Sequence, residues 1–168
     1  MVKSYVGNFL QRAAIRSIWG KSANSRVKVC FATGYSKLHE EILRLEYFNS
    51  KDIIQFSFLD TYRNNIYKTI MSYKWIVKYC SSSRFVFFSD DDFNVNIQNI
   101  RQFSYRSITT NTMYGHEQCY TRPVRNQSSK WYISEEQYPF DMFPTFLSGG
   151  AILTHISVVC RLNIAFRM

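Results

Sequence analysis

Short apolar runs, each bounded by polar residues, recur along the first half of the chain. Three of them have the length and the β-branched or aromatic composition of strands: VKVCFAT at 27–33, DIIQFSF at 52–58 and RFVFFS at 84–89. The stretches between these runs place apolar residues three or four positions apart, which is the spacing of one helix face. The pattern therefore predicts strands that alternate with helices.

Three helices are predicted from this spacing. The first begins near Ser36, the second spans 64–80 and the third spans 94–103. Their expected inward faces are, in order, Leu38, Ile42, Leu45 and Phe48; Ile66, Ile70, Tyr73 and Val77; and Ile97, Ile100 and Phe103. Such an alternation predicts an α/β fold with a mostly parallel central sheet flanked by helices. Further along, LSGGAILTHISVV is expected to be a glycine turn that leads into a strand or helix.

Length and composition indicate a single globular domain over residues 1–168. Apolar residues make up 46% of the chain and charged residues 20%, which excludes a disordered chain. A net charge of +9 favours an anionic partner, but the basic residues are scattered and form no polybasic tail. A basic module that binds nucleic acid is therefore one functional alternative.

The apolar runs, the cysteines and a glycosylation sequon bear on the cellular compartment and the redox state. No run of about 18 apolar residues occurs, and MVKSYVGNF lacks the pattern of a signal peptide. Cys30, Cys80, Cys119 and Cys160 are widely spaced without CxxC, which argues against zinc and leaves both disulfides and free thiols open. Asn126 begins a glycosylation sequon, which matters only in a secretory lumen.

Three consecutive aspartates, Asp90, Asp91 and Asp92, follow the third predicted strand. Open α/β sheets bind ligands beyond the carboxyl ends of their strands, where these side chains are expected. In extended backbone Asp90 and Asp92 point the same way while Asp91 turns aside. Two carboxylates with water and diphosphate suit Mg²⁺ or Mn²⁺, and three adjacent like charges repel without a cation. The alternative is that the aspartates cap the following helix.

Several separated stretches, in the same order, resemble motifs of the β1,3-galactosyltransferase-type glycosyltransferases. They are RAAIRSIWG (12–20), DIIQFSFLDTYRNNIYKT (52–69), WIVKYC (75–80), DDDFNVN (90–96), PVRNQSSKWYISEEQYP (123–139) and FPTFLSGGAILT (143–154). Each is modest evidence alone. Their common order over nearly the whole chain makes the resemblance strong.

The resemblance implies a GT-A type nucleotide-sugar-binding fold whose C-terminal part is missing here. It implies an inverting hexosyltransferase that takes galactose or an N-acetylhexosamine from a UDP-sugar. The sugar would pass to a glycan, glycoprotein or glycolipid hydroxyl in β1,3 linkage, with Mn²⁺ or Mg²⁺ as cofactor and without nucleic acid as a partner. The full-length form is expected to be membrane-anchored, with this domain in the Golgi lumen.

Residue roles follow from the matched motifs. The three aspartates match the DxD region, with Asp90 and Asp92 as metal ligands, Asp92 the more direct, and Asp91 beside the donor. The other expected donor contacts are Arg12, Arg16, Lys68, Trp131, Ser148, Gly149 and Gly150. For the basic residues a solvated helix face remains the alternative, for Trp131 core packing, and for the glycines an ordinary turn.

The match fails at both ends of the chain. Inverting transfer needs a general base. In the family that duty is given to an acidic motif after the SGG stretch, and no such motif follows it here. The chain also enters its first strand partway along, and Asn94 replaces an aromatic residue. A catalytically inactive fragment or pseudoenzyme of the same fold is therefore the closest functional alternative.

Overall fold

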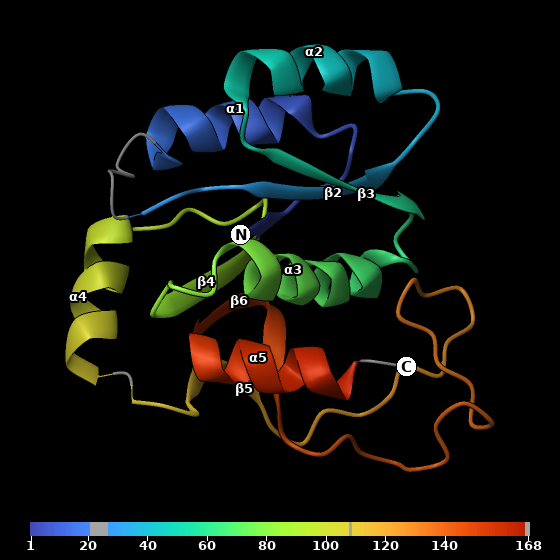
Figure 1. Ribbon diagram of the computed structural model, residues 1–168. Coiled ribbons are helices and arrows are strands. Elements are labelled where there is room, and N and C mark those ends of the chain that lie inside the picture. The colour runs from blue at the N-terminus through green and yellow to red at the C-terminus, as the bar shows by residue number, and fades with distance from the viewer. Residues whose placement is uncertain (21–26, 108, 167–168) are drawn as a thin grey trace.

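The structure is a computed structural model that describes residues 1–20, 27–107 and 109–166. It contains an alternation of strands and helices around one sheet (Figure 1). In chain order the elements are β1 (Val2–Lys3), α1 (Phe9–Ile18), β2 (Phe31–Tyr35), α2 (Glu40–Ser50), β3 (Ile53–Leu59), α3 (Asn65–Tyr79), β4 (Phe85–Asp90), α4 (Ile97–Ser107), β5 (Met113–Gln118), β6 (Phe146–His155) and α5 (Ile156–Ala165).

The sheet has six strands in the order β3-β2-β1-β4-β6-β5. Strands β3, β2, β1 and β4 are parallel, and β6 runs antiparallel to both β4 and β5. The short β1 lies between β2 and β4, with Lys3 beside Asp90 in the register. The prediction of an α/β fold with a mostly parallel sheet is confirmed, and the architecture is consistent with a GT-A type domain.

Helices cover both faces of this sheet (Figure 1). One face carries α1 and α2 above a cluster that includes Val2, Phe31 and Ile53, which are neighbours across β1, β2 and β3. The opposite face carries α3 and α5, whose Tyr73 and Val159 pack with residues of β4. Strand alternation explains this division, because successive side chains of a strand point to opposite faces.

The predicted helices occur, but their buried faces differ from the prediction. In α2 the expected inward residues Ile42, Leu45 and Phe48 are exposed, and Leu43 is buried. The neighbouring Glu46 turns toward α1, where it pairs with two arginines. Ion pairing of this helix therefore overrides its apolar spacing. Of the other expected core positions, Leu38, Ile66 and Phe103 are also exposed, whereas Tyr73 and Ile97 are buried and Ile100 packs against the core.

The SGG stretch is not a turn, which corrects the prediction. Ser148, Gly149 and Gly150 lie inside β6. No described glycine has a positive φ, so these positions do not need glycine for its left-handed conformation. Of the two glycines, only Gly150 is closely packed, against the ring of Phe93.

Two further expectations are resolved in the described residues. Cys30, Cys80, Cys119 and Cys160 are all free thiols. No helix in this part of the chain is both long and apolar enough to cross a bilayer. Segment 119–145 is mostly loop, and Arg125 organises it by donating hydrogen bonds to the carbonyls of Ile133, Tyr138 and Phe140.

Candidate functional site

The three aspartates at positions 90–92, called the acidic turn below, lie at the carboxyl ends of β1 and β4, in the middle of the sheet. Asp90 is the last residue of β4, and its Oδ1 lies 2.9 Å from Nζ of Lys3 at the end of β1. The same ammonium donates a 2.8 Å hydrogen bond to the carbonyl of Gly149 in β6. Lys3 therefore joins the aspartate and glycine motifs, which lie far apart in the sequence.

Asp91 contacts other residues than Asp90 does, although the extended backbone assumed in the prediction ends at Asp90 and residues 91–92 form a turn. Its Oδ2 accepts hydrogen bonds from the hydroxyl of Ser4 at 2.6 Å and from the side-chain amide of Asn8 at 2.9 Å. Both donors belong to the loop between β1 and α1. The carboxylate of Asp91 thus holds this loop against the end of β4.

Asp92 is exposed, and the capping alternative for the aspartates does not hold. Helix α4 begins at Ile97, and the side chain of Asn96 accepts the hydrogen bond from the backbone N–H of Asn99. Because an asparagine already occupies the capping position, the aspartates are not needed there.

Two glycines of β6 lie next to Asp90 and its partner Lys3. A Cβ added at Gly150 would lie 2.7 Å from the ring of Phe93 and 3.8 Å from Oδ2 of Asp90. At Gly149 an added Cβ would meet only Nζ of Lys3, at 3.8 Å. Gly150 therefore makes room for the aromatic ring that follows the aspartates, whereas Gly149 has space to spare.

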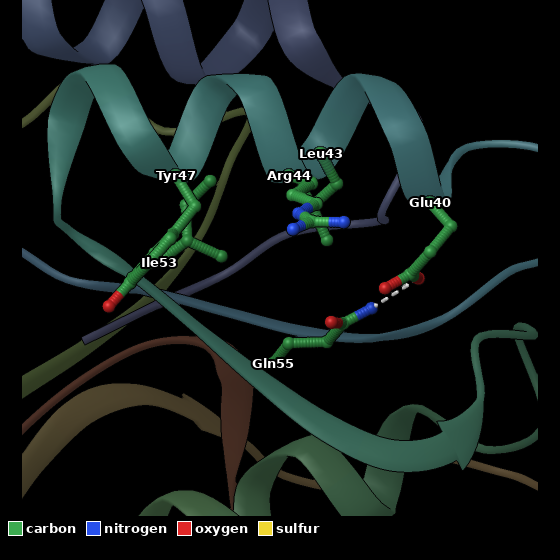
Figure 2. A pocket seen from close by; sticks show the side chains of 6 residues that line it. All are labelled: Glu40, Leu43, Arg44, Tyr47, Ile53 and Gln55. Carbon is green, nitrogen blue, oxygen red and sulfur yellow. Dashed lines mark hydrogen bonds between the residues drawn. The ribbon is translucent and has the colours of Figure 1, made fainter.

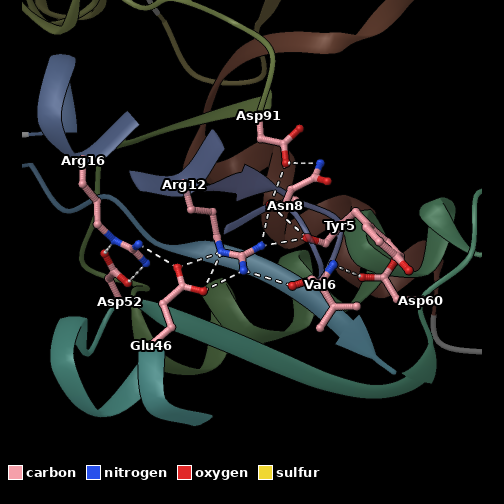
Figure 3. A network of polar contacts seen from close by, with 10 residues as sticks. Tyr5, Val6, Asn8, Arg12, Arg16, Glu46, Asp52, Asp60 and Asp91 are labelled. Atoms are coloured by element: carbon pink, nitrogen blue, oxygen red, sulfur yellow. Dashed lines mark hydrogen bonds and ion pairs between the residues drawn. The ribbon is translucent and has the colours of Figure 1, made fainter. Parts of the chain in front are cut away.

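Arg12 lies beneath this site rather than in it (Figure 3). Its side chain is fully buried and donates to Oγ of Ser4 and to the carbonyls of Tyr5 and Val6. It also pairs with Glu46 at 2.7 Å. The expected contact of Arg12 with nucleotide is therefore corrected, because its guanidinium is already satisfied inside the protein.

Arg16 extends the same network to the start of β3. It pairs with Glu46 at 2.6 Å and with Asp52 at 2.8 Å, and its side chain is 25% exposed. Burial acts to raise the pKa of Glu46, but hydrogen bonds and charge from the two arginines outweigh it, so the pKa is lowered. Burial likewise acts to lower the pKa of Arg16, but Asp52 and Glu46 raise it overall. These groups form a folded-state ion network.

Lys68 is also internal, which corrects its expected contact with the donor. Its Nζ lies 2.7 Å from Oδ1 of Asp60, and the two side chains are 5% and 1% exposed. The other oxygen of Asp60 accepts hydrogen bonds from the backbone N–H groups of Val6 and Gly34. This buried pair therefore ties α3 to the loop after β1, to β2 and to the residue that follows β3.

Trp131 lies on the long loop segment and is 59% exposed, so core packing is not its role. The ammonium of Lys130 lies over its ring at 4.5 Å and over the ring of Tyr62 at 5.6 Å. This places the loop next to the residues that follow β3. The arrangement leaves Trp131 available to a ligand on the surface.

Two cavities lie away from the aspartates. One of about 240 Å³ lies between α2 and β3, lined by residues such as Leu43, Arg44 and Gln55 (Figure 2). Another of about 560 Å³ lies at the amino end of β4, near Arg84 and Trp75. Neither is lined by Asp90, Asp91 or Asp92. Among the described residues, no group of three or more His, Cys, Asp or Glu side chains is arranged to hold a metal ion.

Sequence reasoning missed four contributors to this site: Lys3, Ser4, Asn8 and Phe93. Lys3 and Ser4 could have been found from strand alternation, since Lys3 ends the strand that neighbours β4 and Ser4 follows it. Asn8 and Phe93 act through loop geometry, for which the sequence carries no signal.

The fold and this site together define an α/β domain with an acidic turn beside a glycine-bearing strand. The sequence model of the Galactosyltransferase family matches residues 10–167, and the chain belongs to that family. It is 33% identical over 159 residues to the beta-1,3-galactosyltransferase brn of Drosophila melanogaster, which covers 91% of this chain and 49% of that protein.

Two other curated relatives are similar. The chain is 31% identical over 155 residues to human beta-1,3-galactosyltransferase 5, with 89% of this chain and 50% of that protein covered. It is 30% identical over 176 residues to lactosylceramide 1,3-N-acetyl-beta-D-glucosaminyltransferase A of Danio rerio, with 96% and 46% covered. The chain thus spans about half the length of the curated relatives it matches.

Proposed function

We propose that this chain is the donor-binding part of a glycosyltransferase. The proposed reaction moves galactose or an N-acetylhexosamine from a UDP-sugar to a glycan hydroxyl in β1,3 linkage, with inversion. The observation that carries the proposal is that Lys3 links Asp90 of the acidic turn to Gly149 of β6, in a member of the Galactosyltransferase family. The names of its relatives include both galactosyl and N-acetylglucosaminyl transferases, so either donor sugar is compatible.

The proposed cofactor is Mn²⁺ or Mg²⁺. The available donors at the site are carboxylate oxygens, the ligands that these hard cations prefer. Asp92 is exposed, and Asp90 keeps Oδ2 near Gly150 while Oδ1 pairs with Lys3. Asp91 is given a different role, because its carboxylate already holds Ser4 and Asn8. When bound, the ion would neutralise the diphosphate of the leaving group.

The chain's own residues would position the donor. The Arg12–Glu46 pair fixes the loop after β1 from below, and Asp91 fixes it from the side. The small residues Gly149 and Gly150 would let the sugar approach β6, with Ser148 on the same strand. Trp131 offers an exposed ring for stacking on sugar C–H groups. No residue is assigned here as the general base.

The proposed setting is the Golgi lumen, with a glycan, glycoprotein or glycolipid as acceptor. A glycosphingolipid acceptor is compatible with the name of the Danio rerio relative. The competing possibilities are a pseudoenzyme of this fold and, less favoured, a nucleic-acid-binding module. The family membership supports the glycosyltransferase and the pseudoenzyme over the nucleic-acid-binding module.

The experiment that tests the proposal is a thermal unfolding series with UDP-galactose or UDP-N-acetylglucosamine and Mn²⁺. Ligand that binds only the folded state raises the melting temperature. A rise that needs both components, and that Asp92→Ala abolishes, supports the proposal. A folded sample whose melting temperature does not respond at millimolar concentrations contradicts it. Turnover of the donor in the same samples separates an enzyme from a pseudoenzyme, and salt-dependent binding of an oligonucleotide would instead favour the nucleic-acid module.

A further inference from the structure

Lys3 is an ammonium ion enclosed in the middle of the sheet. The side chain is only 7% exposed, and lysines are seldom buried to this extent unless they are paired. Its partners are Oδ1 of Asp90 at 2.9 Å and the carbonyl of Gly149 at 2.8 Å. Since Lys3 and Asp90 are neighbours in the strand register, both side chains point to the same face of the sheet.

This contact bears on the charge of the acidic turn. Three adjacent carboxylates repel one another unless a cation lies nearby. Here the chain itself supplies one positive charge, and it supplies it to Asp90 rather than to the exposed Asp92. A divalent cation that approaches Asp90 therefore meets a carboxylate that is already paired and an ammonium ion of like charge.

We propose that Lys3 is a built-in counter-ion of Asp90 that competes with a divalent cation for this carboxylate. The inference rests on the proposed function, because it assumes that the acidic turn binds such an ion. It assigns Lys3 a positioning role that none of the family motifs carries. The cation alone then binds weakly, and the diphosphate of a donor supplies the negative charge that both Lys3 and the cation can share.

The competition is tested with Mn²⁺ alone, without nucleotide, by electron paramagnetic resonance of the free ion. Lys3→Met removes the charge and keeps a chain of similar length. Because one positive charge a few ångströms from the ion disappears, Mn²⁺ should bind about tenfold more tightly than to the unsubstituted chain. Lys28→Met is the matched control, because it changes the net charge by the same amount as Lys3→Met. Lys28 is exposed and lies at the opposite end of the sheet from Asp90.

The experiments distinguish failure of this inference from failure of the proposed function. Tighter Mn²⁺ binding in Lys3→Met, with Lys28→Met unchanged, supports the inference. Equal or weaker binding in Lys3→Met overturns it, even when UDP-sugar and Mn²⁺ together still stabilise the unsubstituted chain as the proposed function requires. Absence of that joint stabilisation is instead the failure of the proposed function.

A second measurement covers the case in which Lys3→Met does not fold. In the unsubstituted protein labelled with ¹⁵N at lysine Nζ, the ammonium signal of Lys3 is followed by NMR during titration with Mg²⁺. A shift of this signal that saturates with Mg²⁺, absent for exposed lysines such as Lys74, supports the competition. A Lys3 signal that does not respond while Mg²⁺ binds at Asp92 overturns it.

Discussion

The hydroxyl of Ser4 donates a 2.6 Å hydrogen bond to Oδ2 of Asp91, and this contact joins the end of β1 to the acidic turn after β4. The same hydroxyl accepts a 3.0 Å hydrogen bond from Nη1 of Arg12, which in turn pairs with Glu46 of α2 (Figure 3). A continuous set of polar contacts therefore runs from a surface helix to the middle aspartate. The three aspartates differ in role because only one of them is part of this set.

The first prediction separates Asp91 from Asp92. Asp91→Ala removes the charged acceptor of two hydrogen bonds and should lower the free energy of unfolding by about 2 kcal/mol. Asp92→Ala removes an exposed carboxylate and should change it by less than about 0.5 kcal/mol. Urea unfolding of the two variants provides the measurement. Equal losses in both would contradict the division of roles.

The second prediction concerns acid. The pKa of Glu46 is lowered in the folded state, so its contribution to stability is complete above its ordinary pKa of 4.5 and is lost as the pH falls through the lower folded value. The free energy of unfolding should therefore decline between about pH 5 and pH 3. Glu46→Gln should be less stable at neutral pH and show a shallower decline.

The matched control for this prediction is Glu41→Gln, which alters an exposed carboxylate in the first turn of α2. It should keep the acid dependence of the unsubstituted chain. If Glu46→Gln and Glu41→Gln have the same pH profile, the Arg12 and Arg16 contacts do not set the acid sensitivity.

Periodicity was sufficient for the central elements of this fold, from β2 to α4, but it did not predict β1, α1 or β5, and it read the SGG part of β6 as a turn. The runs at 52–58 and 84–89 became β3 and β4 almost residue for residue, because strand length and turn residues are local properties. The helix from Ser36 was also correct as an element. Its buried face was not, because Glu46 is drawn to Arg12 and Arg16 on a helix that lies far away in the sequence.

The site was predictable in position but less so in its contacts. The aspartates lie at the carboxyl end of β4 as expected, but Asp91 and Asp92 form a turn, so the strand alternation expected of them does not extend past Asp90. Charge alone could not tell whether Arg12 and Lys68 face a ligand or the interior. That depends on Glu46 and Asp60, whose positions only the tertiary structure fixes.

The third prediction tests the buried pair of Lys68 and Asp60. Lys68→Met leaves an uncompensated carboxylate in the interior and should cost about 3 kcal/mol in the free energy of unfolding. Lys74→Met, at an exposed position of the same helix, should be nearly neutral. Chemical denaturation compares the two variants. A loss below about 1 kcal/mol for Lys68→Met would mean that water screens this pair as it does at a surface.

The double variant Asp60→Asn/Lys68→Met refines this prediction. Removing both charges leaves no unpaired charge in the interior. The double variant should therefore lose less free energy of unfolding than the two single variants lose together. Some loss should persist, because Asp60 also accepts hydrogen bonds from the backbone of Val6 and Gly34.

The last prediction uses the two adjacent glycines of β6 as a matched pair. Gly150→Ala would place a Cβ 2.7 Å from the ring of Phe93, so the ring must move. Because this ring is 40% exposed and can turn outward, the free energy of unfolding should fall by no more than about 1 kcal/mol. Gly149→Ala meets only Nζ of Lys3 at 3.8 Å, an ordinary contact, and should be close to neutral. Adding Phe93→Leu to Gly150→Ala should recover part of the loss by removing the ring. If Gly149→Ala is the more harmful change, or Phe93→Leu gives no recovery, the close approach of Phe93 to β6 is not what selects glycine at position 150.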